Sequence, residues 1–280
     1  MTPFTLNLRG RLAEYSRPVV MGVLNVTPDS FYSGSRAQTR ADIANRARQL
    51  VADGADMLDI GAYSSRPGAD DVSADEELRR LEAGLSAVRE TVGYDIPVSV
   101  DTFRADVARR AVEWGADIIN DISGGLLDED MFETVADLHV PYILMHMRGT
   151  PATMQTMTDY TDVVADVIGE LSHKLSRLEE LGVADVIIDP GFGFAKTLDQ
   201  NYRLLSHLDS FAILRRPVLA GMSRKSMLTR LLGIDATEAL VPTAIVGALA
   251  LERGAAILRV HDPREAAQAI AIVDKLKIKG

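Results

Sequence analysis

The sequence predicts a closed (β/α)8 TIM barrel with a short N-terminal hairpin. Two observations predict it: eight short apolar runs recur along the 280 residues, and stretches of helical period separate them. Continuous apolar runs that alternate with amphipathic helices are typical of a parallel sheet covered by helices. Each run also stops on a polar residue that a core strand would not favour. Because such barrels build their active site at the carboxyl ends of the strands, these polar residues are expected to converge on one cleft.

The runs follow one another at the spacing of βα units, with clear helical stretches at Arg40 to Asp53, Asp75 to Thr91 and Glu238 to Arg253. An open doubly wound sheet would show the same alternation and stays open as the structural alternative. The runs and their stops are Pro18 to Leu24 before Asn25, Met57-Leu58 before Asp59, Ile96 to Val100 before Asp101, Asp117 to Ile119 before Asn120, Tyr142 to Met145 before His146, Val186 to Ile188 before Asp189, Val218 to Met222 before Ser223, and Ala256 to Leu258 before Arg259.

The first residues predict the hairpin. Phe4, Leu6 and Leu8 alternate with polar residues up to Arg9-Gly10, and Leu12-Ala13 follows the turn. A period of two is typical of strands with one buried face. The hairpin is expected to cover the N-terminal mouth of the barrel.

Composition indicates one domain that binds a small molecule. At 47% hydrophobic residues the chain can bury one large core, and no linker divides it, so residues 1–280 are expected to form a single domain. The formal net charge of −10 argues against nucleic-acid binding. No apolar run reaches about 18 residues, and Arg9 and Arg11 interrupt the N-terminal stretch, which argues against a membrane span or a secretory leader.

The chain has no cysteine. This excludes a disulfide framework and a thiolate metal site, and it fits a reducing compartment. A cytoplasmic location is therefore expected.

The first two loops after strands are polar. Asn25 to Phe31 turns at once, which can be simple turn chemistry, but the first βα loop of a barrel opens onto the cleft. In the second loop Ser64 and Ser65 stand beside Arg66, and hydroxyls next to an arginine suit phosphate oxygens. A solvated surface loop would have the same composition.

Three strand ends carry side chains that suit a flat heterocycle. Asp101, Asn120 and Asp189 are expected to point into one mouth, where two carboxylates and a carboxamide offer acceptors and donors to ring amines and amides. The alternative is a set of buried carboxylates paired with Lys225 and Arg259, which also arrive there.

Later segments add candidates for anion and ring binding. Asp189 to Thr197 places two aromatic residues on a glycine-bent loop, and Ser223 to Ser226 opens a helix whose N-terminus favours an anion. A satellite core and an ordinary helix cap are the alternatives. Arg259 and His261 project to the same side of a strand and suit a phosphate. His146, between two methionines, is interpreted as structural.

No histidine pair has metalloprotease spacing, no catalytic serine triad is evident, and the carboxylates are too scattered for a protein-only metal site. A magnesium ion (Mg2+) held mainly by substrate phosphates, with one protein oxygen from Asn25, remains a hypothesis.

Taken together, these segments resemble the dihydropteroate synthase family from about Val19 to Asp262. The matching motifs are Gly22 to Phe31 (GVLNVTPDSF), Ser64 to Ala69 (SSRPGA), Val98 to Phe103 (VSVDTF), Ile119 to Gly124 (INDISG), Leu144 to Met154 (LMHMRGTPATM), Asp189 to Lys196 (DPGFGFAK), Ser223 to Met227 (SRKSM) and Arg259 to Asp262 (RVHD). The family pattern differs at Tyr32 to Ser35, where Ser-Asp-Gly-Gly is common, and at Ala62 to Ser65, where Gly-Glu-Ser-Thr is common.

The resemblance implies a pterin-binding barrel of folate biosynthesis, a family that sulfonamides target. Its members join 6-hydroxymethyl-7,8-dihydropterin diphosphate to 4-aminobenzoate, and many pair as homodimers through helices far from the cleft. The resemblance also assigns roles: Asp101, Lys225 and Arg259 to catalysis; Asp101, Asn120, Met145, Asp189, Lys225 and Arg259 to the pterin; Asn25, Ser65, Arg66, Arg259 and His261 to the diphosphate, with Asn25 on magnesium; and Phe31, Pro67, Phe194, Lys225 and Ser226 to the aminobenzoate.

Two other functions stay open at this point. A methyltetrahydrofolate methyltransferase acting on a corrinoid protein would share the pterin-reading side chains but has no use for Arg66, for the Arg259 and His261 pair or for the loop Asn25 to Phe31. The intact Lys225 and Arg259 argue against a non-catalytic pterin-binding barrel.

Overall fold

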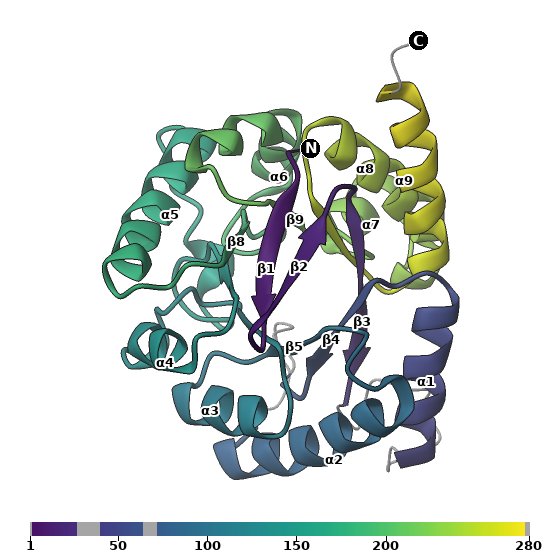
Figure 1. Cartoon of the computed structure of the whole chain (residues 1–280). Coiled ribbons are helices and arrows are strands. Elements are labelled where there is room, and N and C mark those ends of the chain that lie inside the picture. Colours follow the sequence, from purple (N-terminus) through teal and green to yellow (C-terminus); the bar gives the residue numbers. More distant parts are fainter. Residues whose placement is uncertain (1, 27–39, 64–71, 278–280) are drawn as a thin grey trace.

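The computed structural model describes residues 2–26, 40–63 and 72–277, and these form a parallel barrel surrounded by helices (Figure 1). The barrel strands run in the order β8-β7-β6-β5-β4-β3-β10-β9, and every pair in that order is parallel. Their bounds are β3 (Val19–Asn25), β4 (Met57–Gly61), β5 (Val98–Asp101), β6 (Ile118–Asp121), β7 (Tyr142–Met145), β8 (Val186–Asp189), β9 (Leu219–Ala220) and β10 (Ile257–Val260).

The sheet closes on itself between its first and last strands. Ile188 of β8 forms a parallel bridge with Val218, and its backbone N–H donates to the carbonyl of Pro217 at 2.9 Å. This closure excludes the open doubly wound sheet and confirms the predicted barrel.

Helices connect the strands and cover the outside of the barrel, as predicted. The three helical stretches expected from the sequence correspond to α1, α2 and α8 to within one or two residues. The α-helices are α1 (Arg40–Ala52), α2 (Ala74–Val92), α3 (Ala105–Glu113), α4 (Met131–Leu138), α5 (Val163–Glu180), α6 (Leu198–Ser206), α7 (Ser226–Leu232), α8 (Leu240–Glu252) and α9 (Pro263–Lys277); short 3-10 turns are η1 (Met154–Thr156), η2 (Leu208–Leu214) and η3 (Ala236–Glu238). Among these described helices, none combines the length and apolar character needed to cross a membrane.

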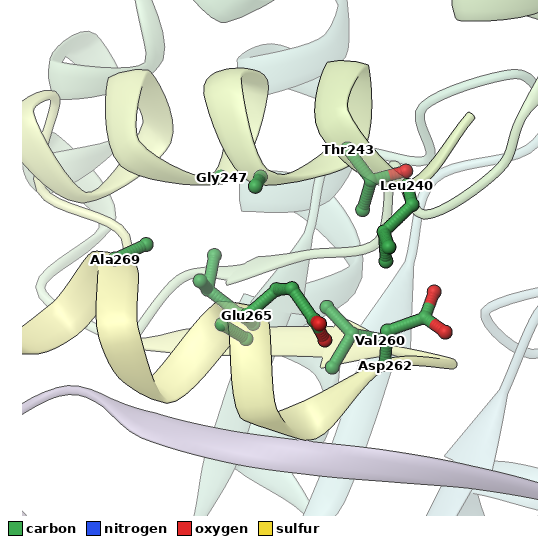
Figure 2. Close-up of a pocket in the computed structure, with 10 residues that line it drawn as sticks. Leu240, Thr243, Gly247, Val260, Asp262, Glu265 and Ala269 are labelled. Atoms are coloured by element: carbon green, nitrogen blue, oxygen red, sulfur yellow. The ribbon is translucent and has the colours of Figure 1, made fainter. Parts of the chain in front are cut away.

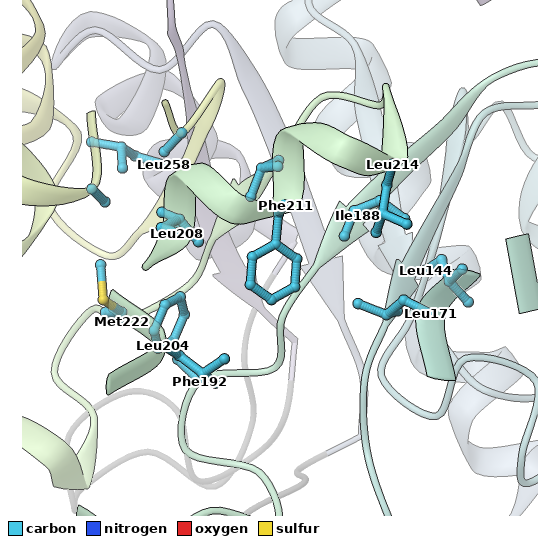
Figure 3. Packing of buried hydrophobic residues seen from close by; sticks show 14 of the residues in the cluster. Leu144, Leu171, Ile188, Phe192, Leu204, Leu208, Phe211, Leu214, Met222 and Leu258 are labelled. Carbon is cyan, nitrogen blue, oxygen red and sulfur yellow. The ribbon is translucent and has the colours of Figure 1, made fainter. Parts of the chain in front are cut away.

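The main apolar core lies between the outer face of the strands and the helices. Alternate strand residues point outward, so Leu144 and Ile188 pack against α5, α6 and η2. Figure 3 shows Phe211 of η2 among side chains that include Leu171 of α5 and Phe192 of the loop after β8. The inward-facing residues are left to fill the barrel and to build its mouth.

The predicted hairpin closes the N-terminal end of the barrel. Strands β1 (Phe4–Leu8) and β2 (Arg11–Tyr15) pair antiparallel through a two-residue turn at Arg9-Gly10, and both turn residues have positive φ, as such turns require. Leu6 and Leu8 are buried in one cluster with inward-facing residues of the barrel strands. Figure 1 shows the hairpin in purple across the middle of the helix ring.

Three polar residues that were expected to stop their strands instead lie inside them. Asp59 is the third residue of β4, Asn120 the third of β6, and Arg259 the third of β10. Asp59 and Arg259 occupy inward-facing positions and bond to each other, so the interior layer is polar at this height. An ion pair can replace an apolar layer only where both charges are compensated.

Candidate active site

The centre of the barrel mouth is one guanidinium held between two carboxylates. Arg259 Nε donates to Asp59 Oδ2 at 2.6 Å, and Arg259 Nη2 donates to Asp101 Oδ2 at 2.8 Å. Asp59 is fully buried, whereas the side chains of Arg259 and Asp101 are 20% and 19% exposed. The two exposed partners can therefore meet a ligand, and Asp59 lies beneath them.

Asn120 and Asp189 extend this cluster around the mouth, as expected from the sequence. Asn120 Nδ2 donates to Asp59 Oδ2 at 3.2 Å, and Asp189 Oδ1 accepts from the backbone N–H of Gly191 at 2.8 Å. Both side chains are buried. Asp189 also lies close enough to Lys225 and Arg259 for their charges to act on its pKa, so the carboxamide and the carboxylates come together. The alternative interpretation, carboxylates paired with a cation, also holds for Asp59 and Asp101.

Lys225 enters the mouth from the N-cap position of α7. Its Nζ donates to the carbonyl of Phe192 at 2.5 Å and lies 4.6 Å from the centre of the Phe194 ring. Burial lowers the pKa of Lys225 to about 8, although the nearby Asp189 carboxylate opposes that change. The ammonium of Lys225 therefore loses its proton at a pH closer to neutrality than that of an ordinary lysine.

Burial also changes the acidities of the other charged groups. It raises the pKa of Asp101 to about 7, with Arg259 opposing the rise and the Asp59 carboxylate adding to it. Burial likewise raises the pKa of Asp189. The pKa of Arg259 is raised despite its burial, because Asp59 and Asp101 stabilise its charge. Perturbed acidities of this kind are concentrated at functional sites.

An apolar wall stands beside the polar cluster. Met145 and Phe194 are buried together with Ile122, Met147 and Met154, and Phe103 packs against them. A polar edge next to an apolar wall suits a planar ring that carries hydrogen-bonding groups along one side.

His146 lies in a buried network beneath the loop after β8. Its Nδ1 contacts Lys196 Nζ at 3.0 Å, and its Nε2 contacts Glu170 Oε2 at 3.0 Å. Lys196 Nζ also donates to the carbonyls of Gly191 and Phe194 at 3.0 and 2.9 Å. Burial lowers the pKa of His146 to about 4, so the ring is neutral. The network holds the loop, which agrees with a structural interpretation of His146.

The residues around α7 divide into two groups. Ser223 Oγ lies 3.0 Å from His261 Nδ1 and joins the end of β9 to the end of β10, while Ser226 is exposed at the start of α7. Arg224 points elsewhere: its Nε and Nη2 pair with Asp262 at 2.8 and 2.9 Å, and its Nη1 donates to the carbonyl of Ala236. Arg224 is thus a tie between α7, η3 and the start of α9.

Asn25 ends β3 at the rim of the mouth. A Cβ placed at Gly61 would lie 3.3 Å from Asn25 Oδ1 and 3.9 Å from Asp101 Oδ2, so this glycine leaves room for both oxygens. Within the described ranges, no three His, Cys, Asp or Glu side chains form a metal site. Four predicted site residues lie outside the described residues: Phe31, Ser65, Arg66 and Pro67.

Sequence reasoning gave Asp59 no role beyond ending a strand. The sequence did indicate a further role for Asp59, because an aspartate within an apolar strand requires a buried partner. The partner is 200 residues away at Arg259, which no local pattern reveals.

A cavity outside the mouth is too small to compete for the site. Figure 2 shows it between α8 and α9, lined by Gly247, Val260 and Ala269 and containing only about 10 Å³. That volume accommodates at most one water molecule. Val260 is on the outer face of β10, opposite to Arg259. A polar pocket of about 200 Å³ lies beside His261, between α1 and α9.

The chain matches known proteins over nearly its whole length. Residues 21–261 match the family model described as pterin binding enzyme. The dihydropteroate synthase of Escherichia coli (strain K12) is 40% identical over 268 residues, which cover 95% of this chain and 94% of that protein. The Synechocystis enzyme of the same name is 41% identical over 93% of this chain and 90% of its own length.

Solved structures of similar proteins agree. The dihydropteroate synthase of Xanthomonas albilineans with 4-aminobenzoic acid superposes with a TM-score of 0.91 at 38% identity, over the whole of both chains. The Yersinia pestis enzyme with a sulfonamide drug gives 0.92 at 38% identity, over 99% of this chain and 100% of that one.

The barrel and its polar mouth are those of a pterin-binding enzyme. Within that class the chain belongs to the dihydropteroate synthase family.

Proposed function

We propose that this chain joins 6-hydroxymethyl-7,8-dihydropterin diphosphate to 4-aminobenzoate, giving 7,8-dihydropteroate and diphosphate in folate biosynthesis. The observation that carries the proposal is Arg259 between Asp59 and Asp101, with Asn120, Asp189 and Lys225 around one mouth. The solved Xanthomonas albilineans relatives, described as complexes with 4-aminobenzoic acid and with 7,8-dihydropteroate, support the same substrates.

The buried polar edge would bind the pterin. Asp101 and Asp189 would accept from ring N–H and amino groups, and the Asn120 carboxamide can both donate and accept. Met145 and the apolar wall would cover one face of the ring. Burial without a ligand leaves such groups poorly satisfied, which the raised pKa of Asp189 reflects.

Arg259 and His261 would stabilise the leaving diphosphate, together with Ser65 and Arg66. Asp59 and Asp101 accept from the Nε and Nη2 edge of Arg259, and within the described residues no acceptor contacts Nη1. A guanidinium held along one edge presents its other edge to an anion.

Asn25 would supply one protein oxygen to magnesium. Its amide oxygen is a hard donor at the rim, beside space that Gly61 leaves open, and magnesium is usually held by one or two protein ligands plus phosphate oxygens. When bound, the ion would spread the negative charge of the diphosphate.

The reaction then needs placement more than a dedicated base. The carbon–oxygen bond between the pterin methylene and the diphosphate breaks, the aniline nitrogen forms the new carbon–nitrogen bond, and one aniline proton leaves to solvent. The Asp101 carboxylate would favour positive charge on the methylene carbon. Phe194, Lys225 and Ser226, with Phe31 and Pro67, would hold the aminobenzoate close to it.

We also propose that the enzyme is a cytoplasmic homodimer. Val241, Ile245 and Leu249 recur every four residues along α8 and are each at least half exposed, while Val246 and Ala250 bury its opposite side. A helix that is apolar on all sides is normally buried, and a second copy of the chain would cover the exposed stripe. Light scattering should give twice the 30.4 kDa mass of one chain, and Ile245→Glu should halve it.

A diphosphate-release assay tests the proposed function. Release should require both the pterin diphosphate and 4-aminobenzoate, and it should stop after exhaustive chelation and return with magnesium. Pterin binding without turnover would indicate a non-catalytic barrel. Methyl transfer to a corrinoid protein, without diphosphate release, would indicate the methyltransferase. Full turnover after chelation would refute the magnesium site alone.

A further inference from the structure

Asp59 is unlike the other carboxylates of the mouth. It is fully buried, and its Oδ2 accepts from Arg259 Nε at 2.6 Å and from Asn120 Nδ2 at 3.2 Å. Its Oδ1 is buried and has no hydrogen-bond partner among the described residues. A carboxylate optimised for stability would have both oxygens satisfied. This position therefore keeps a costly charge for another reason.

Asp101 shares the same guanidinium under different conditions. It is at the end of the neighbouring strand, 19% exposed, and accepts from Arg259 Nη2 at 2.8 Å. A ligand in the mouth can reach Asp101 but not Asp59. The cluster holds three carboxylates and two cations, namely Asp59, Asp101, Asp189, Lys225 and Arg259. Asp101 can therefore change partners while Arg259 keeps Asp59 as its counter-ion.

We infer that Asp59 is a positioning residue for the synthase reaction, which holds Arg259 in place so that Asp101 can leave the guanidinium and act on the substrate. The inference rests on the proposed function. Without Asp59, Asp101 would be the sole carboxylate bonded to Arg259, and the two would remain paired. Arg259 would also lose the bond to Nε that fixes the plane of its guanidinium.

A role through Arg259 makes two predictions that a purely structural role does not. First, the loss caused by removing the Asp59 charge should depend on having an arginine at position 259. Second, the acidity of Asp101 should change. Arg259, Asp59, Glu77 and Asp121 all act on Asp101, and the Asp59 carboxylate raises its pKa, so removing that charge should shift the acidic limb of the pH profile to lower pH.

The test is a mutant cycle of Asp59→Asn, Arg259→Lys and the double variant, assayed by diphosphate release with both substrates. Asp59→Asn should lower kcat/KM for the pterin diphosphate by about 10- to 100-fold, since small displacements of catalytic groups have effects of this size. In the Arg259→Lys background, Asp59→Asn should lower kcat/KM by less than about threefold. If Asp59→Asn does not fold, Asp59→Ser removes the charge and leaves room for water.

Asp117→Asn is the matched control. Asp117 is equally buried and pairs with two arginines, Arg9 and Arg89, at the opposite end of the barrel. It should lower the melting temperature and leave kcat/KM and the pH profile unchanged.

The inference would be overturned if the losses of kcat/KM in Asp59→Asn and Arg259→Lys multiplied in the double variant. It would also be overturned if the acidic limb of the pH profile did not move in Asp59→Asn. An equal loss of kcat/KM in Asp117→Asn would also overturn it. If the unmodified protein releases no diphosphate with both substrates, it is the proposed function that fails, and this outcome is distinguishable from the others.

Discussion

Two arginines at opposite ends of the barrel, Arg89 and Arg259, show how the same kind of ion pair serves different purposes. Arg89 donates to the carbonyls of Gly115, Gly93 and Ile96 and pairs with Asp117, which also pairs with Arg9 of the hairpin. Arg259 bonds only carboxylates among the described residues. The first cluster is satisfied by the fold itself, whereas the second is left with capacity for a ligand.

The difference agrees with the usual roles of the two ends of such barrels. Residues at the N-terminal face support stability, and residues at the carboxyl ends of the strands perform chemistry. Here the N-terminal cluster ties the hairpin, α2 and β6 together. The C-terminal cluster concentrates charges whose pKa values burial has changed, at Asp101, Asp189 and Lys225.

The largest expected effect is on stability. Arg89→Met would leave Asp117 with a single cation and three backbone carbonyls without their donor. We expect the free energy of unfolding to fall by about 3 to 5 kcal/mol, the usual result of breaking a buried pair. Urea denaturation measures it. A change of less than about 1 kcal/mol would show that the N-terminal cluster is not the stabilising one.

The next effect is on binding. Asp189→Asn replaces an acceptor-only carboxylate with a group that presents a mismatched donor to the pterin edge. A hydrogen bond to a charged group contributes about 1.5 to 3 kcal/mol, so pterin affinity should fall roughly 10- to 150-fold. Calorimetry with pterin, beside circular dichroism for the fold, is the measurement. Unchanged affinity in a folded variant would remove Asp189 from the site.

A further effect is a pH dependence with opposite signs for activity and stability. The pKa of Asp101 is raised from 3.8 to about 7, so turnover that needs its carboxylate should rise with pH through about 7. The folded state binds this proton more tightly than the unfolded state. Its stabilising contribution is therefore complete below pH 3.8 and is lost as the pH rises to about 7.

Asp101→Asn is the control for that pH dependence. It should remove the acidic limb of the activity profile and flatten the stability curve over the same range. A limb that persists in this variant would belong to another group.

Much of the architecture could be predicted because it depends on local pattern. Apolar runs, helical period and the alternation of Phe4, Leu6 and Leu8 specify strands, helices and the hairpin without knowledge of their partners. The ends of parallel strands must meet at one mouth, so the grouping of Asp101, Asn120 and Asp189 followed from topology alone.

The interior ion pair could not be predicted in the same way. Arg259 meets Asp59 and Asp101 across 200 and 158 residues, and these pairings depend on the register of the closed barrel. For the same reason the contact between Lys196 and His146, which are 50 residues apart, was not foreseen. The roles of Phe31, Ser65, Arg66 and Pro67 stay predictions.

The most direct test of the division between the two ends is Lys225→Met, measured for diphosphate release and for unfolding. Burial disfavours the Lys225 charge, so an apolar side chain should not destabilise the fold. We predict a loss of turnover of about 100-fold or more with the free energy of unfolding unchanged or raised. The control, Arg224→Met, breaks the tie to Asp262 and should lower stability by about 1 to 3 kcal/mol with turnover within about threefold. Retained turnover in Lys225→Met, or a parallel loss of stability and activity, would contradict the account.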